Sequence, residues 1–116
     1  MKTTGRTLQH LKKLGLRCWN VEKYNTFSHR YEDLFNIIDI ILLDSSRGII
    51  GIQACGKDYQ EHVRKMTIDE AESTKAWLDA GGYLEIWGWS KKKLKRGGKA
   101  MRWKPRIQEI TVGDLK

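Results

Sequence analysis

Residues 34–55 read LFNIIDIILLDSSRGIIGIQAC, and this stretch decides the fold that we expect. Two apolar runs, Leu34 to Leu43 and Gly48 to Cys55, lie on either side of DSSRG, a cluster of turn-forming residues. Short apolar runs bounded by turn residues are typical of strands that are buried on both faces. We therefore predict that the two runs pair as the central hairpin of a sheet.

Asp39 lies inside the first of these runs, between Ile38 and Ile40. A buried carboxylate is stable only when it is ion-paired, hydrogen-bonded or bound to a metal ion. If the hairpin closes around DSSRG, Asp39 and Gln53 lie on the same or adjacent rungs of the ladder. A carboxylate beside an amide oxygen suits a hard cation such as Mg²⁺. The alternative is that Asp39 lies near the strand edge and pairs with a Lys or Arg, or hydrogen-bonds to the backbone.

Alternation along a strand also predicts which residues accompany Asp39. In a regular strand, side chains two positions apart share one face of the sheet. If the strand is regular from residue 33 onward, one face of the sheet carries Asp33, Phe35, Ile37, Asp39 and Ile41.

The remaining elements follow from periodicity and from turn residues. Leucines at helical spacing, with Gly15 as a stop, predict a helix over residues 3–14, and a second helix with a bend near residues 66–69 is predicted to end at Gly81 and Gly82. Beside the central hairpin we predict, in chain order, a strand over 16–24, a polar turn over 25–33, the second helix over 58–80, and strands over 83–89 and 102–112. Pro105 favours an edge position for the last strand. The result is one α/β domain over residues 1–116, with a mixed central sheet flanked by helices.

Composition points to an anionic partner. The chain has 116 residues and a formal charge of +8, and residues 91–106 carry nine positive charges and no negative one. Such a field attracts polyanions, chiefly nucleic acid, although a solvated surface is the alternative reading. The Gly-containing segment near 91–102 is interpreted as a mobile basic linker. No apolar run approaches the roughly 18 residues of a membrane span, so we expect a soluble, cytoplasmic protein with no membrane partner.

Cysteine and tryptophan are interpreted as structural residues. Cys18 and Cys55 match no metal-binding spacing, so both are expected to be reduced thiols. Trp77, Trp87, Trp89 and Trp103 could stack on bases, but Trp77 and one of the pair Trp87 and Trp89 are expected in the core. The two members of that pair share a strand face.

A family resemblance is carried by VEKYNTFSHRYEDLFNIIDIILLD at residues 21–44, followed by GIIGIQAC, EHVRKM, AWLDAGGYLEIWGW and RW. These segments look like small phage and bacterial proteins of the PD-(D/E)XK nuclease superfamily, akin to Holliday-junction resolvases, over about Val21 to Trp103. The resemblance implies a restriction-endonuclease-like core of helix, three strands, helix and strand. In that pattern Asp39 takes the place of the first metal-binding Asp, and Gln53 takes the place of the next acid.

The chain departs from the superfamily pattern at two positions. Gln53 carries no charge, and Cys55 stands where the lysine is expected. Lys65, from the following helix, or Lys57 is a candidate replacement for that lysine, and Glu22 or Asp33 is a candidate replacement carboxylate. The resemblance thus implies catalytic roles for Asp39, Gln53, Lys65, Asp33 and Glu22, with Asp39, Gln53 and Asp33 holding Mg²⁺ or Mn²⁺.

Three functions remain open at this point. The first is a metal-dependent DNA endonuclease with branched DNA as a candidate substrate, and the second is a non-catalytic DNA-binding module that keeps the nuclease fold. The third is a small phage-type inhibitor or assembly protein. Convergence of Glu22 or Asp33 with Asp39 would favour chemistry, whereas an isolated Asp39 would favour binding alone.

Partners are predicted for the two DNA-directed functions. We expect DNA to bind with little sequence preference, and a homodimer is expected by analogy with resolvases. The expected DNA contacts are Arg6, Lys57, His62, Arg64, Lys91, Lys92, Lys93, Lys95 and Arg96.

Overall fold

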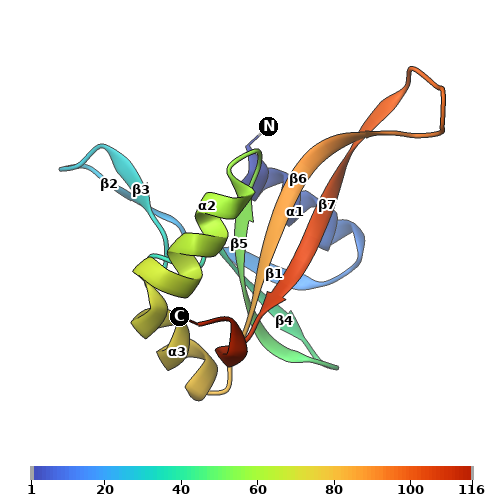
Figure 1. Cartoon of the computed structure of the whole chain (residues 1–116). Coiled ribbons are helices and arrows are strands. Elements are labelled where there is room, and N and C mark those ends of the chain that lie inside the picture. The colour runs from blue at the N-terminus through green and yellow to red at the C-terminus, as the bar shows by residue number, and fades with distance from the viewer. Residues whose placement is uncertain (1, 116) are drawn as a thin grey trace.

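The computed structural model describes residues 2–115 and contains a mixed five-stranded sheet with helices on both faces (Figure 1). The strand order is β1-β4-β5-β6-β7, in which β5 and β6 are parallel and every other pair is antiparallel. The strands are β1 (Arg17–Asn20), β4 (Ile40–Asp44), β5 (Gly48–Cys55), β6 (Tyr83–Lys93) and β7 (Met101–Ile110). The α/β class and the mixed, helix-flanked sheet predicted from the sequence are confirmed.

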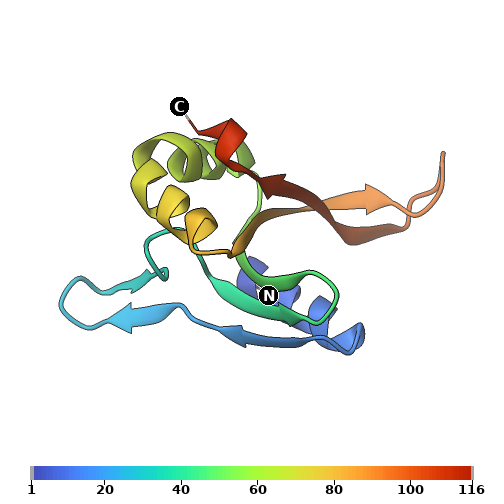
Figure 2. The same cartoon turned by 90° about the horizontal axis from the view of Figure 1, so that it is seen from below.

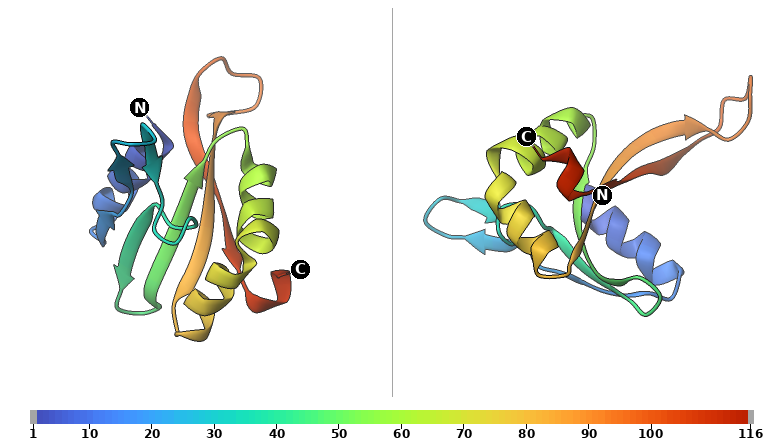
Figure 3. Two further views of the ribbon diagram at one scale, coloured as in Figure 1. Left: turned by 90° about the vertical axis from the view of Figure 1, so that its left-hand side faces the viewer. Right: turned by 60° about the horizontal axis from the view of Figure 1, so that its bottom comes forward.

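Helices cover the two faces of the sheet unequally. Helix α1 (Thr3–Lys13) lies on one face, and the opposite face carries α2 (Tyr59–Arg64), the π-helical turn η1 (Lys65–Asp69) and α3 (Ala71–Asp79) (Figure 3). Alternation along β6 sorts the core accordingly, since Trp87 packs in the cluster of Leu11 from α1, whereas its neighbour Ile86 packs in the cluster of Met66 from η1. The chain closes with a short helical turn, η2 (Val112–Asp114). Within residues 2–115 no helix has both the length and the apolar character needed to cross a membrane.

The central hairpin forms as predicted. Ile40 pairs with Ile52 and Asp44 pairs with Gly48, whose φ of +111° suits glycine at the turn. Asp44 stabilises the turn because its carboxylate accepts hydrogen bonds from the Ser46 backbone N–H at 2.9 Å and from Arg47 Nε at 3.1 Å. The apolar strands and the polar turn therefore fix one register between β4 and β5.

The tryptophan predictions are also confirmed. Trp87 and Trp89 share one face of β6 and are both buried against α1, and the indole of Trp89 donates a hydrogen bond to Thr7 at 2.8 Å. Trp77 packs against the other core cluster, and its indole N–H donates to the Tyr83 carbonyl at 2.7 Å. The indoles of Trp77, Trp87 and Trp89 therefore pack in the hydrophobic core and are not platforms for stacking bases.

The crossover helix is interrupted where the sequence suggested a bend. The π-helical turn over Lys65–Asp69 separates α2 from α3, and Thr74 donates a hydrogen bond to the Met66 carbonyl at 2.6 Å across the break. The segment ends at Gly81, which has a φ of +101°. At Gly82 an added Cβ would lie 2.5 Å from Cε2 of Trp77, so a larger residue would not fit there.

The expected regular strand from residue 33 onward is wrong. Leu34 instead pairs with Ile38 around a turn in which Phe35 and Asn36 have φ values of 54° and 61°. Asn tolerates this left-handed region better than most residues, which explains how an apolar run can contain a turn. As a result Phe35 is 58% exposed and does not share a face with Asp39.

The expected polar turn over residues 25–33 is also wrong. Strands β2 (Lys23–Asn25) and β3 (Arg30–Glu32) form a separate two-stranded sheet that projects from the body (Figure 1). We call residues 23–32 the β2–β3 arm. Tyr24 packs edge-to-face against Tyr31 with ring centroids 5.2 Å apart, so an aromatic cross-strand pair supports this short hairpin.

A second hairpin projects on the opposite side of the molecule (Figure 2). Strand β6 does not end at Trp89, as expected, but continues to Lys93 and pairs with β7 through Lys93 and Met101. Residues 91–93 and 101–102 of the expected linker near 91–102 are therefore regular strand, residues 94–100 form the loop between them, and we call residues 88–106 the β6–β7 arm. A run of lysines carries no alternation in polarity, so the sequence pattern could not reveal this extension. The edge position of β7, predicted from Pro105, is confirmed.

Candidate functional site

Two turns bring three carboxylates together at one end of the sheet. The β2–β3 ladder ends with Lys23 opposite Glu32, so Glu22 and Asp33 flank its base. Asp33 lies one residue before Leu34, Asp39 lies one residue after Ile38, and the Leu34–Ile38 bridge sets the two acids side by side. Carboxylate oxygens of Glu22, Asp33 and Asp39 all lie within 4.8 Å of one another, and three such oxygens could hold a metal ion. Glu22 and Asp33 therefore both converge with Asp39, which is the arrangement that we expected to favour catalysis over binding alone.

Asp39 is buried, with 4% of its surface exposed, and its carboxylate is hydrogen-bonded. Its Oδ2 accepts one bond from Gln53 Nε2 at 2.8 Å and another from the Ala54 backbone N–H at 2.8 Å. The predicted adjacency of Asp39 and Gln53 is confirmed, because the β4–β5 register sets Ile40 opposite Ile52 and leaves these two as the next pair. These bonds explain how a carboxylate is accommodated beside a run of isoleucines.

Burial and the second acid give the carboxylates unequal proton affinities. Burial, together with the hydrogen bond and the negative charge of Asp33, raises the pKa of Asp39 to about 9. Burial alone would also raise the pKa of Asp33, but hydrogen bonds with Asp39, Gln53 and Lys65 outweigh it and lower that pKa. The pair therefore shares one proton at neutral pH, as two closely spaced carboxylates do. A bound cation would replace that proton.

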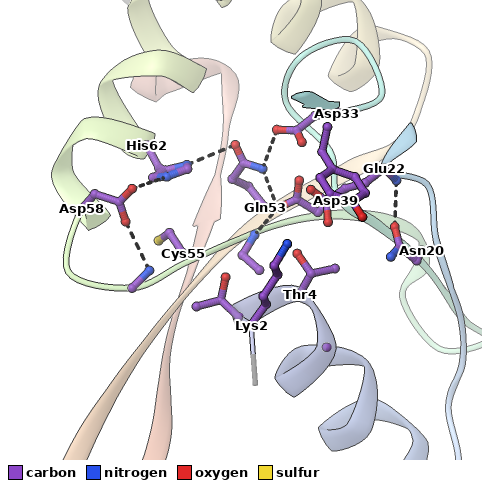
Figure 4. A pocket seen from close by; sticks show the side chains of 15 residues that line it. Lys2, Thr4, Asn20, Glu22, Asp33, Asp39, Gln53, Cys55, Asp58 and His62 are labelled. Carbon is purple, nitrogen blue, oxygen red and sulfur yellow. Dashed lines mark hydrogen bonds and ion pairs between the residues drawn. The ribbon is translucent and has the colours of Figure 1, made fainter. Parts of the chain in front are cut away.

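Gln53 faces the acids with its amide nitrogen. Nε2 donates to Asp39 and, at 3.1 Å, to Asp33, while Oε1 lies 3.2 Å from Nδ1 of His62. The other ring nitrogen of His62 lies 2.8 Å from Asp58 Oδ2, which continues the chain of contacts (Figure 4). From the sequence we expected Gln53 to offer an oxygen to a metal ion. In this arrangement Gln53 orients the carboxylates, and the oxygen points away from them.

A lysine reaches the cluster from the crossover segment. Nζ of Lys65 lies 3.1 Å from Asp33 Oδ2, which is the approach predicted for a lysine relocated to the helix. Lys57 is exposed in the loop after β5 and does not line the cavity described below. Cys55, at the superfamily position for lysine, is buried, and burial, with the charges of Asp58 and Asp39, raises its pKa to about 12. This thiol is therefore unsuited to act as a nucleophile.

The carboxylates line a cavity of about 590 Å³ at the meeting point of α1, the β2–β3 arm and α2 (Figure 4). Several residues that line it were not predicted from the sequence, including Lys2 and Thr4 at the start of α1, Asn20 at the end of β1, and Tyr31 on the β2–β3 arm. Lys2 Nζ lies 4.8 Å from the ring centroid of Tyr31, which brings a cation to the rim. No local motif in the sequence marks these residues, because tertiary packing alone brings them to the acids.

The predicted DNA-contact residues are divided among several surfaces. Lys91, Lys92 and Lys93 lie on the β6–β7 arm, and Lys95 and Arg96 lie in its loop. His62 lines the cavity, and Arg64 is exposed on α2. The guanidinium carbon of Arg6 lies 4.0 Å from the ring centroid of Trp103, which is 41% exposed. Arg102, Lys104 and Arg106, which were not among the predicted contacts, lie on β7 of the same hairpin opposite Lys92, Ser90 and Gly88.

The site thus combines a set of hard oxygen donors with a lysine, beside an extended cationic hairpin. Carboxylates in this arrangement suit divalent cations such as Mg²⁺ and Mn²⁺. In comparisons with known proteins, no family model, no curated protein and no solved structure matched the chain.

Proposed function

We propose that the protein is a metal-dependent DNA endonuclease of the PD-(D/E)XK type. The observation that carries the proposal is the convergence of Glu22, Asp33 and Asp39, with Lys65 bonded to Asp33. A purely structural Asp39 would need one partner, whereas this site gathers three acids in one cavity at the cost of mutual repulsion. The chain order of helix, central hairpin, crossover helix and parallel strand agrees with the restriction-endonuclease-like core included in the proposal.

Each residue has a role in the proposed reaction. A bound Mg²⁺ would lower the pKa of a water molecule and neutralise charge that develops on the phosphate. Glu22, Asp33 and Asp39 would hold that ion, and Gln53 donates its N–H groups to keep the two aspartates oriented. Lys65 pairs with Asp33, and its charge would stabilise a phosphate oxygen brought to the site. His62 and Asp58 fix the amide of Gln53.

A second candidate is a DNA-binding module without catalysis. One observation favours it, because Gln53 stands where the superfamily has an acid and turns its nitrogen toward the carboxylates. Removing one negative charge weakens attraction for a divalent cation. The Gln53→Glu variant distinguishes the two candidates, since added charge should tighten metal binding at a working site.

The proposed activity is tested on linear duplex, single-stranded and four-way-junction DNA, each with Mg²⁺, Mn²⁺ or chelator. Wild type is expected to cut at least one substrate with metal and none in chelator. Asp39→Asn should lose the cleavage by about 1,000-fold or more while keeping DNA affinity, because it removes a metal ligand only. Asp69→Asn is the matched control, since Asp69 is an exposed acid outside the cavity, and it should cut like wild type.

Two outcomes contradict the proposal. If wild type cuts no substrate with either metal but binds DNA, the binding module replaces the nuclease. If Asp39→Asn cuts as fast as wild type, the measured activity does not arise at this site. Sedimentation with and without junction DNA tests the proposed homodimer separately.

A further inference from the structure

The β6–β7 arm has two chemically different faces. The ladder pairs Gly88 with Arg106, Ser90 with Lys104, and Lys92 with Arg102, and paired residues of a ladder share a face. We call the exposed set Ser90, Lys92, Arg102, Lys104 and Arg106 the basic face. The opposite face of the same ladder carries Trp89, Lys91, Lys93, Met101, Trp103 and Pro105. The basic face thus holds four cations, no acid and no apolar side chain.

The basic face leads into the carboxylate site. Lys92, Lys104 and Arg106 line a hollow of about 400 Å³ together with Tyr59 and Gly56. Gly56 also lines the cavity that contains the carboxylates, so the two hollows share a wall. Arg106 is held at this junction, because its guanidinium carbon lies 4.3 Å from the ring centroid of Tyr59. A ligand lying along the basic face would therefore run toward Glu22, Asp33 and Asp39.

The basic face carries an electrostatic cost in the free protein. Lys92 lies directly opposite Arg102, and like charges at opposite positions destabilise a ladder. None of Lys92, Arg102 and Lys104 forms a salt bridge within residues 2–115. A polyanion would relieve this repulsion.

We propose that the basic face is a track for the phosphate backbone of duplex DNA, which it directs into the carboxylate cavity. This inference rests on the proposed nuclease function and names the surface that positions its substrate. Same-face side chains along a strand recur every ~6.8 Å. This distance is about twice the 3.4 Å rise per phosphate along one DNA strand, so successive side chains on the basic face are spaced to meet every second phosphate. The absence of apolar side chains on this face argues against a membrane as the anion, because membrane-binding surfaces insert apolar groups.

The test compares two variants of equal charge. Lys92→Gln combined with Lys104→Gln removes two cations from the basic face, whereas Lys91→Gln combined with Lys93→Gln removes two from the opposite face. Affinity for a 30-base-pair duplex is measured in chelator between 50 and 200 mM salt. The basic-face variant should lose about 10-fold in affinity, and its slope of log K against log salt should fall by about 1.8, or 0.9 per lost contact. The opposite-face variant should change affinity less than about 3-fold.

Several results would overturn the track. These are equal losses in both variants, a larger loss in the opposite-face variant, or no duplex binding by wild type at 50 mM salt. Binding to phosphatidylserine vesicles with the same dependence on Lys92 and Lys104 would identify a membrane as the partner instead. Circular dichroism and thermal unfolding of both variants confirm that the fold is kept.

Failure of the track is distinguishable from failure of the nuclease. The binding measurement contains no metal, so the predicted contrast between variants stands or falls whether or not wild type cuts DNA. If wild type cuts and the basic-face variant cuts with an unchanged KM, the track is wrong and the nuclease remains. If wild type never cuts and the contrast is observed, the surface is a DNA track on a non-catalytic module.

Discussion

The two hairpin arms differ in how they join the body and in what they bring to the site. The β6–β7 arm is a continuation of the five-stranded sheet (Figure 3). Strand alternation divides its cations between two faces. The β2–β3 arm is a separate sheet, and its base supplies Glu22 and Asp33. The β6–β7 arm therefore contributes positive charge along its length, whereas the β2–β3 arm positions two carboxylates at its base. The extended basic surface is built on a regular ladder, whereas the carboxylate cluster depends on the turns that bring Glu22 and Asp33 to Asp39.

The largest expected effect on this difference between the arms comes from removing an acid at the base of the β2–β3 arm. Asp33→Asn should reduce metal-dependent cleavage by roughly 100-fold or more, because it removes a ligand and the partner of Lys65. Binding of Mn²⁺, followed by its paramagnetic resonance signal, should weaken in parallel. Glu32→Gln is the control, since the neighbouring Glu32 accepts a hydrogen bond from Asn25 and an amide oxygen can do the same. Unchanged Mn²⁺ affinity in Asp33→Asn would remove this residue from the site.

The root of the β6–β7 arm is expected to respond through packing. At Gly88 an added Cβ would overlap the ring of Tyr59, whose hydroxyl donates to Gln108 at 2.6 Å. Gly88→Ala should therefore lower the free energy of unfolding by about 1–3 kcal/mol, as overpacking does. Urea unfolding measures the loss, and Gly113→Ala is the control, because its Cβ would make only an ordinary contact with Thr111. A Gly88→Ala protein as stable as wild type would show that Tyr59 does not constrain the arm.

The acid cluster should also make the free energy of unfolding depend on pH. The pKa of Asp39 rises from 3.8 to about 9 on folding, so the folded state holds the extra proton between these values. Its stabilising effect is complete below about pH 4 and is lost as pH rises toward 9. In chelator, Asp39→Asn should therefore gain about 1–2 kcal/mol on wild type between pH 5 and pH 8. Parallel curves for the two proteins from urea unfolding would argue against a shared proton.

The smallest expected effect lies at the tip of the β2–β3 arm. The side chain of Asn25 accepts from the Phe27 backbone N–H at 2.8 Å and donates to Glu32, so it closes the turn. Asn25→Ala should destabilise the arm locally by about 1 kcal/mol. Faster amide exchange is expected for this arm alone, with no change in the β6–β7 arm. Phe27→Ala should leave exchange unchanged, because that ring is 95% exposed.

Sequence patterns predicted the parts of the molecule that repeat or that carry strong local signals. The β4–β5 hairpin was predictable from two apolar runs around DSSRG, and its register placed Asp39 beside Gln53. The break within the crossover helix and the edge position of β7 were predictable from turn residues and from Pro105.

The parts that could not be predicted depend on interactions that local pattern does not contain. The turn at Phe35 and Asn36 lies inside an apolar run, where periodicity favours a strand. The β2–β3 arm is short and polar, and it depends on one aromatic pair and on the Asn25 bonds. Glu22 and Lys65 were named as candidates through the family resemblance, and no spacing rule joins them to Asp39. Alternation did place Asp33 on the same face as Asp39, but through a regular strand that does not form. Their convergence required the folded chain.

The single parallel pairing in the sheet decides which end of the molecule the β6–β7 arm extends from. Because β5 and β6 run in the same direction, the strand that ends at Cys55 and the strand that continues into the arm point toward one edge. A direct hairpin in place of the crossover over residues 56–82 would reverse β6 and direct its extension away from the carboxylates. The crossover also carries Lys65. The crossover therefore places both Lys65 and the β6–β7 arm near the carboxylates. A different connection between β5 and β6 would separate the lysine, the arm and the carboxylates from one another.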